Sequence, residues 1–274
     1  MDCNTMNGNS AWNPVPAVQE KKGLCGSTLK LIAVVAMFID HVGAAVLARV
    51  LMYGRMVTLN GGNAVTQWLL ENEHLYTIYM VMRFIGRIAF PIYCFLMIQG
   101  FEHTRDRRKY AFRLGLFAII SEIPFDLAFS GKVLEFGYQN VFFTLFIGFL
   151  TMWACNTVAQ KAEWGKVPKA LLSILIVAAG MVIAKLLKTD YDAIGVFCIM
   201  VLFFTRKNKV QQIVAGCLAF CWELTAPLAF IPIGFYNGKR GWKMKYFFYI
   251  FYPAHLLLLY VICYFMGLSQ FSAI

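Results

Sequence analysis

Apolar runs of about 20 residues recur from Lys30 to Leu268, and a hydrocarbon core of about 30 Å needs about that many residues per helix. Of the 274 residues, 60% are hydrophobic and 14% are charged, whereas soluble domains average about 45–50% and about 25%. We therefore expect an all-α, polytopic transmembrane helical bundle with about 8–10 membrane segments. The expected helices are 30–51, 75–101, 109–129, 139–157, 168–187, 193–205 and 246–268, with a compound stretch at 210–236.

The compound stretch at 210–236 is expected to form a short helical hairpin. As one span, it would place the basic sequence NGKRGWKMK (237–245) on the opposite side of the membrane from the other basic loops. A turn near Glu223 and Pro227 returns that sequence to the same side. The domain boundaries follow from these elements: a polar, disordered tail at 1–28 that lacks a cleavable signal, one transmembrane domain at 29–268, and a short tail at 269–274.

The formal net charge is +11, and most Lys and Arg residues lie in short loops between apolar runs. Such loops face the cytoplasm and meet anionic lipid headgroups, so we expect the lipid bilayer, and no nucleic acid, as the partner of this charge. The loop HTRDRRKYAFR (103–113) is strongly basic, whereas 52–74 sets Arg55 against Glu71 and Glu73. This difference predicts a cytoplasmic N-terminus and a cytoplasmic 103–113 loop.

Ionisable side chains fall at similar depths inside several expected helices. At about 1.5 Å per residue, Asp40 and His41 lie about 15–17 Å from the cytoplasmic end of the first helix. Such groups are costly in lipid and tend to mark a pathway, a site or a buried pair. A layer near the midplane is therefore expected to line a hydrated or ligand-filled cavity, and it holds Asp40, His41, Arg87, Glu122 and His255.

Two further tiers flank this layer. The outer tier is acidic and polar and the inner tier is basic, which suits an anionic cytoplasmic donor and an acceptor that arrives from the other side. The outer tier holds Asp126, Asn140, Asp190, Asp192 and Glu223, and the inner tier holds Arg105, Arg107, Arg108, Lys109 and Arg113.

Purely structural interpretations stand beside this one. Arg87 with Glu122, or Asp40 with Arg83, could be an ion pair that holds two helices together. The eight cysteines lie mostly inside apolar runs and are typical of small core residues. No metal site is expected, because Cys217 and Cys221 lie one helical turn apart but no second pair of Cys or His residues accompanies them.

Structural roles are also open for other polar residues. His255 follows Pro253, and it could hydrogen-bond to a carbonyl that the proline leaves free. Asp190 and Asp192 could belong to a solvated loop.

Asp40 and His41 form the more specific pattern. Neighbours on a helix project about 100° apart, so a carboxylate or arginine from another helix is expected to complete the pair. Gly43 removes bulk and allows a helix or a ligand to approach closely. A histidine titrates near neutral pH and could take a proton from an amine or hydroxyl during acyl transfer. It could equally relay protons in a transporter.

Four stretches together resemble one family. They are IAVVAMFIDHVGA, RFIGRIAFPIYCFLMIQGFEHTRDRRKYAFRLGLFAIISEIPFDL, QNVFFTLFIG and FYPAHLLLLY, in this order over about residues 30–268. The chain resembles the TraX family, named for the membrane protein that acetylates the N-terminus of conjugative pilin. This family is similar in layout to a wider group of transmembrane acyltransferases.

The resemblance implies an acetyltransferase of a bacterial inner membrane that takes acetyl-CoA from the cytoplasm, with no metal. His41 would be the general base, oriented by Asp40 or Glu122, and Arg87 or Asn140 would stabilise the oxyanion. The residues implied to bind acetyl-CoA are Arg83, Arg87, Arg105, Arg107, Arg108, Lys109 and Arg113. Those implied to bind the acceptor are Asn140, Asp126 and His255.

The acceptor itself is not implied: a protein N-terminus or a surface glycan would fit. A homodimer is expected by analogy. The alternative function is a proton-coupled secondary transporter that uses the same buried polar layer.

Overall fold

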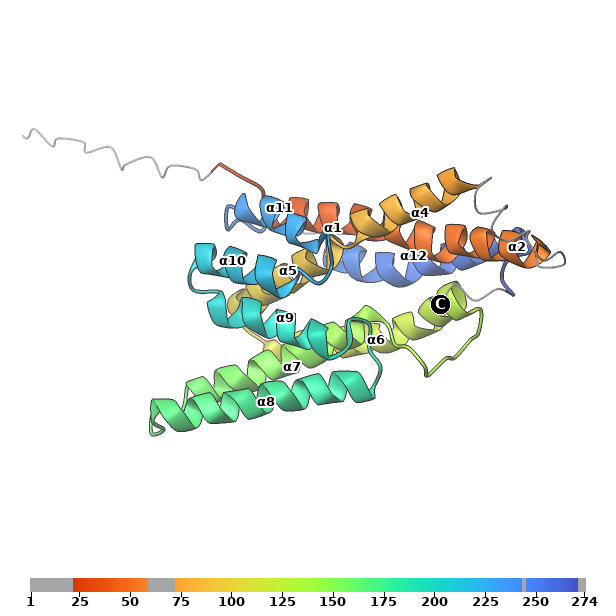
Figure 1. The fold of residues 1–274 in the computed structure, drawn as a ribbon. Helices are drawn as coiled ribbons and strands as arrows, with labels where there is room; N and C mark the ends of the chain where they lie inside the picture. The colour runs from red at the N-terminus through yellow and green to blue at the C-terminus, as the bar shows by residue number, and fades with distance from the viewer. Residues whose placement is uncertain (1–21, 59–71, 243–244, 271–274) are drawn as a thin grey trace, which may run out of the picture.

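The computed structural model describes residues 22–58, 72–242 and 245–270. These residues form helices, with two isolated β-bridges and no strand among them, so the expected all-α bundle is confirmed. The predicted tail up to residue 21 and part of the predicted loop at 52–74 lie outside the described residues. Figure 1 shows the helices α1 (Gly26–His41), η1 (Val42–Leu47), α2 (Ala48–Thr58), α4 (Glu73–Gly86), α5 (Ala89–His103), α6 (Arg107–Ser130), α7 (Val141–Ala159), α8 (Lys166–Leu186), α9 (Asp192–Thr205), α10 (Lys209–Ala219), η2 (Ala226–Ala229), α11 (Phe230–Gly234) and α12 (Lys245–Phe265).

Four helical stretches of the described residues are long and apolar enough to cross a membrane: Gly26–Tyr53, Glu73–His103, Val141–Ala159 and Lys166–Leu186. α9 and the Tyr249–Phe265 part of α12 are apolar but shorter. The chain is therefore a multi-pass membrane protein. α8 lies at the edge of the bundle against α7 (Figure 1), and its apolar side chains are mostly exposed, which is the arrangement expected of a helix that faces lipid.

The predicted hairpin at 210–236 is present. α10 ends at Ala219, a turn passes through Glu223, and η2 and α11 lead back toward the start of α1. There the Leu24 N–H donates to the carbonyl of Phe235 over 2.8 Å. The hairpin thus returns to the end of the bundle at which α1 begins, as the charge pattern predicts.

Two irregular turns interrupt the predicted helices 75–101 and 30–51. Pro91 has no N–H and its ring clashes with the carbonyl four residues earlier, so the first of these helices breaks at Arg87 into α4 and α5. In the second, a π-helical turn follows His41 directly. Gly43 in that turn lies against Met82, whose Cβ would stand 3.1 Å from a Cβ on the glycine. The predicted close approach at Gly43 is therefore confirmed.

Arg49 is a fully buried charge that the sequence analysis does not single out. Its guanidinium donates to the carbonyls of Ala45 at 3.1 Å, Leu127 at 3.3 Å and Ala128. The last two carbonyls belong to the end of α6, where a helix leaves carbonyls without partners of its own. Arg49 thus joins α2 to α6 near the end of the bundle opposite to the start of α1 (Figure 1).

Candidate functional site

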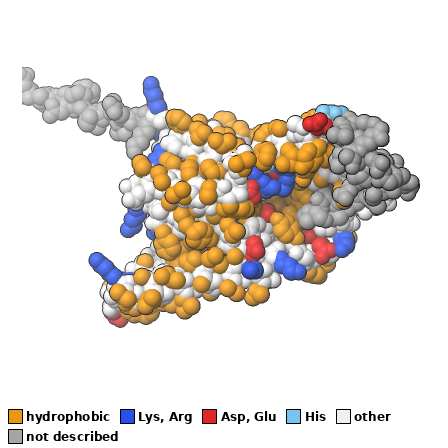
Figure 2. Space-filling model, viewed as in Figure 1, with side chains coloured by type: hydrophobic (Ala, Val, Ile, Leu, Met, Phe, Trp, Pro, Cys, Tyr) orange, Lys and Arg blue, Asp and Glu red, His pale blue; other side chains and the backbone are white. Residues whose placement is uncertain are grey.

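A cavity of about 540 Å³ opens between α1, α4, α5, α6 and α9. Figure 2 shows a hollow in the face of the molecule, where basic and acidic side chains gather among hydrophobic ones. Its wall combines aromatic rings with six charged side chains and one histidine. These are Asp40, His41, Arg83, Arg87, Asp190, Asp192 and Glu223.

Two ion pairs cross this cavity wall. Asp40 in α1 lies 2.8 Å from Arg83 in α4, and Arg87 lies 2.9 Å from Glu223 in the turn after α10. The Asp40–Arg83 pair that the sequence allows is thus present, whereas the alternative pair of Arg87 with Glu122 is wrong. The helix break at Arg87 brings this residue close to the α10–η2 turn, and Thr225 anchors that turn by donating to the Phe84 carbonyl over 2.6 Å.

His41 meets a second histidine. Its Nδ1 lies 2.7 Å from Nε2 of His255 in α12, and Nδ1 of His255 lies 2.7 Å from the carbonyl oxygen of Phe251. The expectation that Asp40 or Glu122 orients His41 is therefore wrong: Asp40 points to α4, about 100° around the helix from its neighbour. The ring of His255 does hydrogen-bond to a carbonyl of its own helix, but the carbonyl that Pro253 leaves free is that of Tyr249, four residues before the proline, so this structural interpretation is confirmed only in part.

Three predicted site residues instead join α6 to the start of α7. Asn140 caps α7 through Oδ1, which accepts from the Phe142 N–H at 3.0 Å, and its amide donates to Glu122. Asp126 accepts from the N–H of Glu135 at 2.8 Å. None of the three described side chains, Glu122, Asp126 or Asn140, lines the cavity. One oxygen of each carboxylate and both polar atoms of the Asn140 side chain bond backbone groups in α6, in the turn between the two helices or at the start of α7. The other oxygens, Oε1 of Glu122 and Oδ1 of Asp126, are buried without a hydrogen-bond partner among the described residues.

The predicted basic inner tier lies at the connection between α5 and α6, outside the cavity lining. Arg107 stands over the ring of Phe101 at 4.2 Å, and Lys109 lies 3.5 Å from Asp106. The Lys109 backbone N–H also donates to Asp106, and this hydrogen bond holds the pKa of that carboxyl below its ordinary value. This part of the tier is a set of exposed or locally paired side chains.

Arg113 lies further along α6 and points to α12. Its guanidinium carbon is 5.6 Å from the ring centre of Tyr110, and its Nε is buried with no hydrogen-bond partner among the described residues. Aromatic rings fill the space from there toward the cavity: the rings of Phe117 and Tyr249 are stacked with their centres 4.7 Å apart, and those of Phe142 and Tyr252 meet edge to face with their centres 5.0 Å apart. Arg113 and His41 are thus separated by packed aromatic side chains.

The loop from Lys188 to Asp192 forms one wall of the cavity in a strained conformation. Lys188, Tyr191 and Asp192 have φ values of 52°, 66° and 46°, in the left-handed region that side chains other than glycine rarely adopt. Hydrogen bonds hold the loop: Gln139 donates to the carbonyl of Lys188 at 2.9 Å, and Asp190 donates to that of Gln139 at 2.8 Å. Strain of this kind tends to persist where it serves a site.

The loop also carries side chains that the sequence analysis assigned differently or missed. Asp190 and Asp192 both line the cavity, but Asp190 is half-buried and Asp192 is exposed, so the solvated-loop interpretation describes Asp192 and not Asp190. Tyr191 stacks on Phe90 with the ring centres 3.8 Å apart, and Tyr138 donates to Asp190. The two tyrosines were missed because aromatic residues are frequent throughout this chain, and only the loop conformation distinguishes them.

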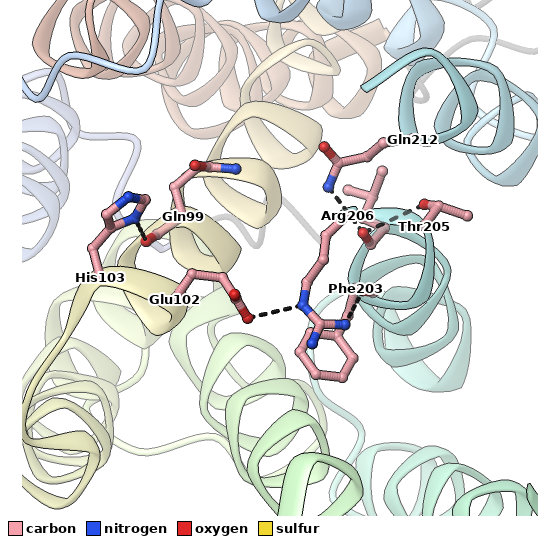
Figure 3. Close-up of polar contacts among 8 residues, drawn as sticks. Gln99, Glu102, His103, Phe203, Thr205, Arg206 and Gln212 are labelled. Carbon is pink, nitrogen blue, oxygen red and sulfur yellow. Dashed lines mark hydrogen bonds and ion pairs between the residues drawn. The ribbon is translucent and has the colours of Figure 1, made fainter. Parts of the chain in front are cut away.

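A second polar cluster lies at the C-terminal ends of α5 and α9 (Figure 3), and none of its residues lines the cavity. Arg206 pairs with Glu102 over 2.8 Å and stands above the ring of Phe203 at 3.8 Å. In the same view, Nδ1 of His103 lies 2.7 Å from the carbonyl oxygen of Gln99. These contacts tie helix ends together at the end of the bundle that carries the basic inner tier.

Comparison with known proteins places this arrangement in a family. The family described as "TraX protein" matches residues 25–263, a range that includes His41, both cavity ion pairs and His255. A protein of Dichelobacter nodosus, named "Probable fimbrial assembly protein FimC, serogroup H1", is 29% identical over 262 residues, which cover 84% of this chain and 92% of that protein. No solved structure matches. The chain belongs to the TraX family.

Proposed function

We propose that this protein is an integral membrane acetyltransferase, which transfers an acetyl group from acetyl-CoA to an amine. The observation that carries the proposal is the position of His41, whose ring lines a cavity that also holds two arginines. A base and cations around one cavity can serve the two needs of acyl transfer, which are removal of a proton and stabilisation of an oxyanion. Membership of the TraX family supports the same activity.

The charge of the cavity favours an amine over a hydroxyl acceptor. Four carboxylates face two guanidinium groups. Each arginine already pairs with one carboxylate, so Asp190 and Asp192 remain as excess negative charge. A negative cavity raises the local concentration of a cationic ligand, and an amine arrives mostly as an ammonium ion. Because the relative from Dichelobacter nodosus is named as a fimbrial assembly protein, the N-terminus of a pilus subunit is the acceptor we propose.

The transfer step follows from these groups. The ammonium ion first loses one proton to water, the neutral amine nitrogen then attacks the thioester carbonyl carbon, and His41 accepts the second proton that the nitrogen loses. Arg87 stabilises the negative charge on the carbonyl oxygen of the tetrahedral intermediate. This intermediate then collapses, the carbon–sulfur bond breaks, and coenzyme A leaves as a thiolate that takes up the proton from His41, which restores the neutral imidazole. Positioned proton transfer contributes about 10²–10⁴-fold and one oxyanion donor about 10²–10³-fold.

The donor would bind from the end of the bundle that carries the basic inner tier, which we propose is the cytoplasmic side of a bacterial inner membrane. Arg113 is the proposed contact for its phosphates, because its Nε is buried and lacks a partner among the described residues. The thioester then has to pass the rings of Tyr249 and Tyr252 to reach His41. Donor binding on this route therefore requires these rings to move.

Binding of acetyl-CoA to the detergent-purified protein tests the proposal. Wild type is compared with Arg113→Ala, His41→Ala and Lys207→Ala, the last being an exposed lysine that controls for loss of one positive charge. We expect weaker binding with Arg113→Ala and unchanged binding with His41→Ala and Lys207→Ala. Acetylation of a peptide that carries a free N-terminus should be lost with His41→Ala. An absence of acetyl-CoA binding by the wild type would reject the proposal and favour the transporter.

A further inference from the structure

We propose that His255 is a positioning residue, which holds His41 in the tautomer with a proton on Nδ1 and a free lone pair on Nε2 toward the cavity. The consequence for catalysis rests on the proposed acetyl transfer. The tautomer itself is a property of the resting protein and can be measured without any substrate.

The geometry of the two rings shows a hydrogen bond between their edges. The planes of His41 and His255 differ by 4°, and the ring centres are 5.0 Å apart. Rings stacked face to face keep their atoms about 3.5 Å apart or more, whereas Nδ1 of His41 and Nε2 of His255 approach to 2.7 Å. The contact therefore lies near the plane of both rings, where imidazole N–H groups and lone pairs point.

The direction of the hydrogen bonds follows from the last acceptor in the chain. The carbonyl oxygen of Phe251 can only accept, so the proton of the 2.7 Å contact sits on Nδ1 of His255. In a neutral imidazole the other nitrogen is then an acceptor. Nε2 of His255 therefore accepts from Nδ1–H of His41, and this leaves Nε2 of His41 without a proton.

Nothing else within the described residues fixes the tautomer of His41. Its Nε2 has no hydrogen-bond partner there, and the neighbouring rings are Phe129 at 5.5 Å and Tyr252 at 5.8 Å. His255 is also surrounded by aromatic rings: its ring centre lies 6.0 Å from that of Phe38 and 4.7 Å from that of Phe251. The residue before His41 in the chain, Asp40, pairs through Oδ2 with Arg83 in α4 over 2.8 Å.

His103 provides an internal comparison. Its Nδ1 also lies 2.7 Å from the carbonyl four residues earlier, that of Gln99 (Figure 3). This local contact is therefore available to a histidine in any helix. What distinguishes His255 is its second nitrogen, which meets a histidine 214 positions away in sequence. The packing of α12 against α1 turns an ordinary helical contact into a chain of two hydrogen bonds that ends at the cavity.

These two hydrogen bonds determine which nitrogen of His41 acts as the proposed base. Nδ1 of His41 keeps its proton throughout, and Nε2 accepts the proton from the acceptor amine. The resulting imidazolium still donates to Nε2 of His255. In hydrolases with a base of this kind, loss of the group that sets the tautomer costs about 10⁴-fold, so removal of His255 should lower acetyl transfer by about 10²–10⁴-fold.

The test is nitrogen NMR of purified protein that carries ¹⁵N-labelled histidine. The chain has four histidines, so single substitutions assign each signal. The variants are His255→Leu, which removes the acceptor, His255→Gln, whose amide can donate to Phe251 and accept from His41, and His103→Leu as the matched control. Acetyl-CoA turnover is measured on the same samples.

We expect wild-type His41 to show a protonated Nδ1 and an unprotonated Nε2. His255→Leu should shift His41 toward the other tautomer and lower turnover, whereas His255→Gln and His103→Leu should retain the wild-type tautomer, and His255→Gln should restore most of the turnover. A protonated Nε2 in the wild type, or an unchanged tautomer in His255→Leu, would overturn the inference. The expected tautomers without any turnover would support the inference and reject the proposed acetyl transfer.

Discussion

Gly86 lies directly against Asp40. A Cβ atom on this glycine would overlap Cβ, Cγ and Oδ1 of the aspartate, so the absence of a side chain in α4 creates the space in which the carboxylate reaches Arg83 at 2.8 Å. The ion pair in the cavity wall therefore depends on a residue that carries no functional group.

Replacing Gly86 with alanine should separate this pair. Glycine to alanine inside a helix normally stabilises by about 0.5–1 kcal/mol, but here the overlap should destabilise the protein by about 1–3 kcal/mol. Unfolding in detergent by urea measures the change. Gly234→Ala is the control, because a Cβ there meets one atom, Cδ1 of Ile213, at 3.8 Å. A stabilised Gly86→Ala variant would show that Asp40 can move away without cost.

Glu223→Gln should leave Arg87 without its counter-ion while keeping the size of the side chain. The side chain of Glu223 is 15% exposed and that of Arg87 is 25% exposed. The free energy of unfolding should therefore fall by about 1–3 kcal/mol, between the values for exposed and fully buried pairs. The control is Lys132→Gln, which breaks the more exposed pair with Glu135 and should cost about 0–1 kcal/mol. Equal losses in the two variants would contradict a special role for the cavity pair.

Arg49→Met should destabilise the end of the bundle where α2 meets α6. The methionine fills similar space but leaves the carbonyls of the half-buried Leu127 and the buried Ala128 without this donor, which costs about 1–3 kcal/mol for each group that stays buried and unsatisfied. The apparent melting temperature in detergent should therefore fall, whereas Lys185→Met, at an exposed lysine of α8, should leave it nearly unchanged. An unchanged value for Arg49→Met would mean that other groups satisfy the carbonyls.

Cys25 should react with alkylating reagents at unusually low pH. Ser27 and Thr28 hydrogen-bond its sulfur over 3.1 and 3.2 Å, and these bonds lower the pKa of the thiol from 9.0 to about 7. A lowered pKa favours the thiolate, which is the reactive form, so alkylation should be half-maximal near pH 7. Ser27→Ala should move this midpoint toward 9.0, as measured by mass spectrometry of the Cys25 peptide. An unchanged midpoint in Ser27→Ala would show that the hydrogen bond from Ser27 does not lower the pKa of Cys25.

The elements of the bundle could be predicted because span length and loop charge are local properties of a sequence. The 210–236 hairpin is a good example, since the basic residues after it require a return to the same side. The divergence of Asp40 and His41 also follows from helix geometry alone. The interaction partners of Asp40 and His41 could not be predicted in this way, because these partners depend on which helices pack together.

His255 illustrates this limit. Its depth in the last helix is visible in the sequence, but its contact with His41 requires the packing of α12 against α1. The positions of Asn140 and Asp126 at the α6–α7 turn could not be predicted for a different reason: a polar residue next to an apolar helix can cap a helix or line a site, and depth does not separate the two. A check for capping positions, such as Asn140 directly before an apolar run, would have assigned it correctly.

The π-helical turn after His41 has a consequence for the whole first helix. A π-turn accommodates one residue more than an α-turn, so α1 and α2 are out of phase with each other across Val42–Leu47. Deleting any one of these residues would remove that extra residue and restore a regular α-helix, and His41 and Arg49 would keep nearly the same directions relative to each other. The π-turn thus allows the first helix to hold one more residue than a regular helix of the same geometry, without changing how the central histidine is directed relative to the arginine near the far end of the bundle.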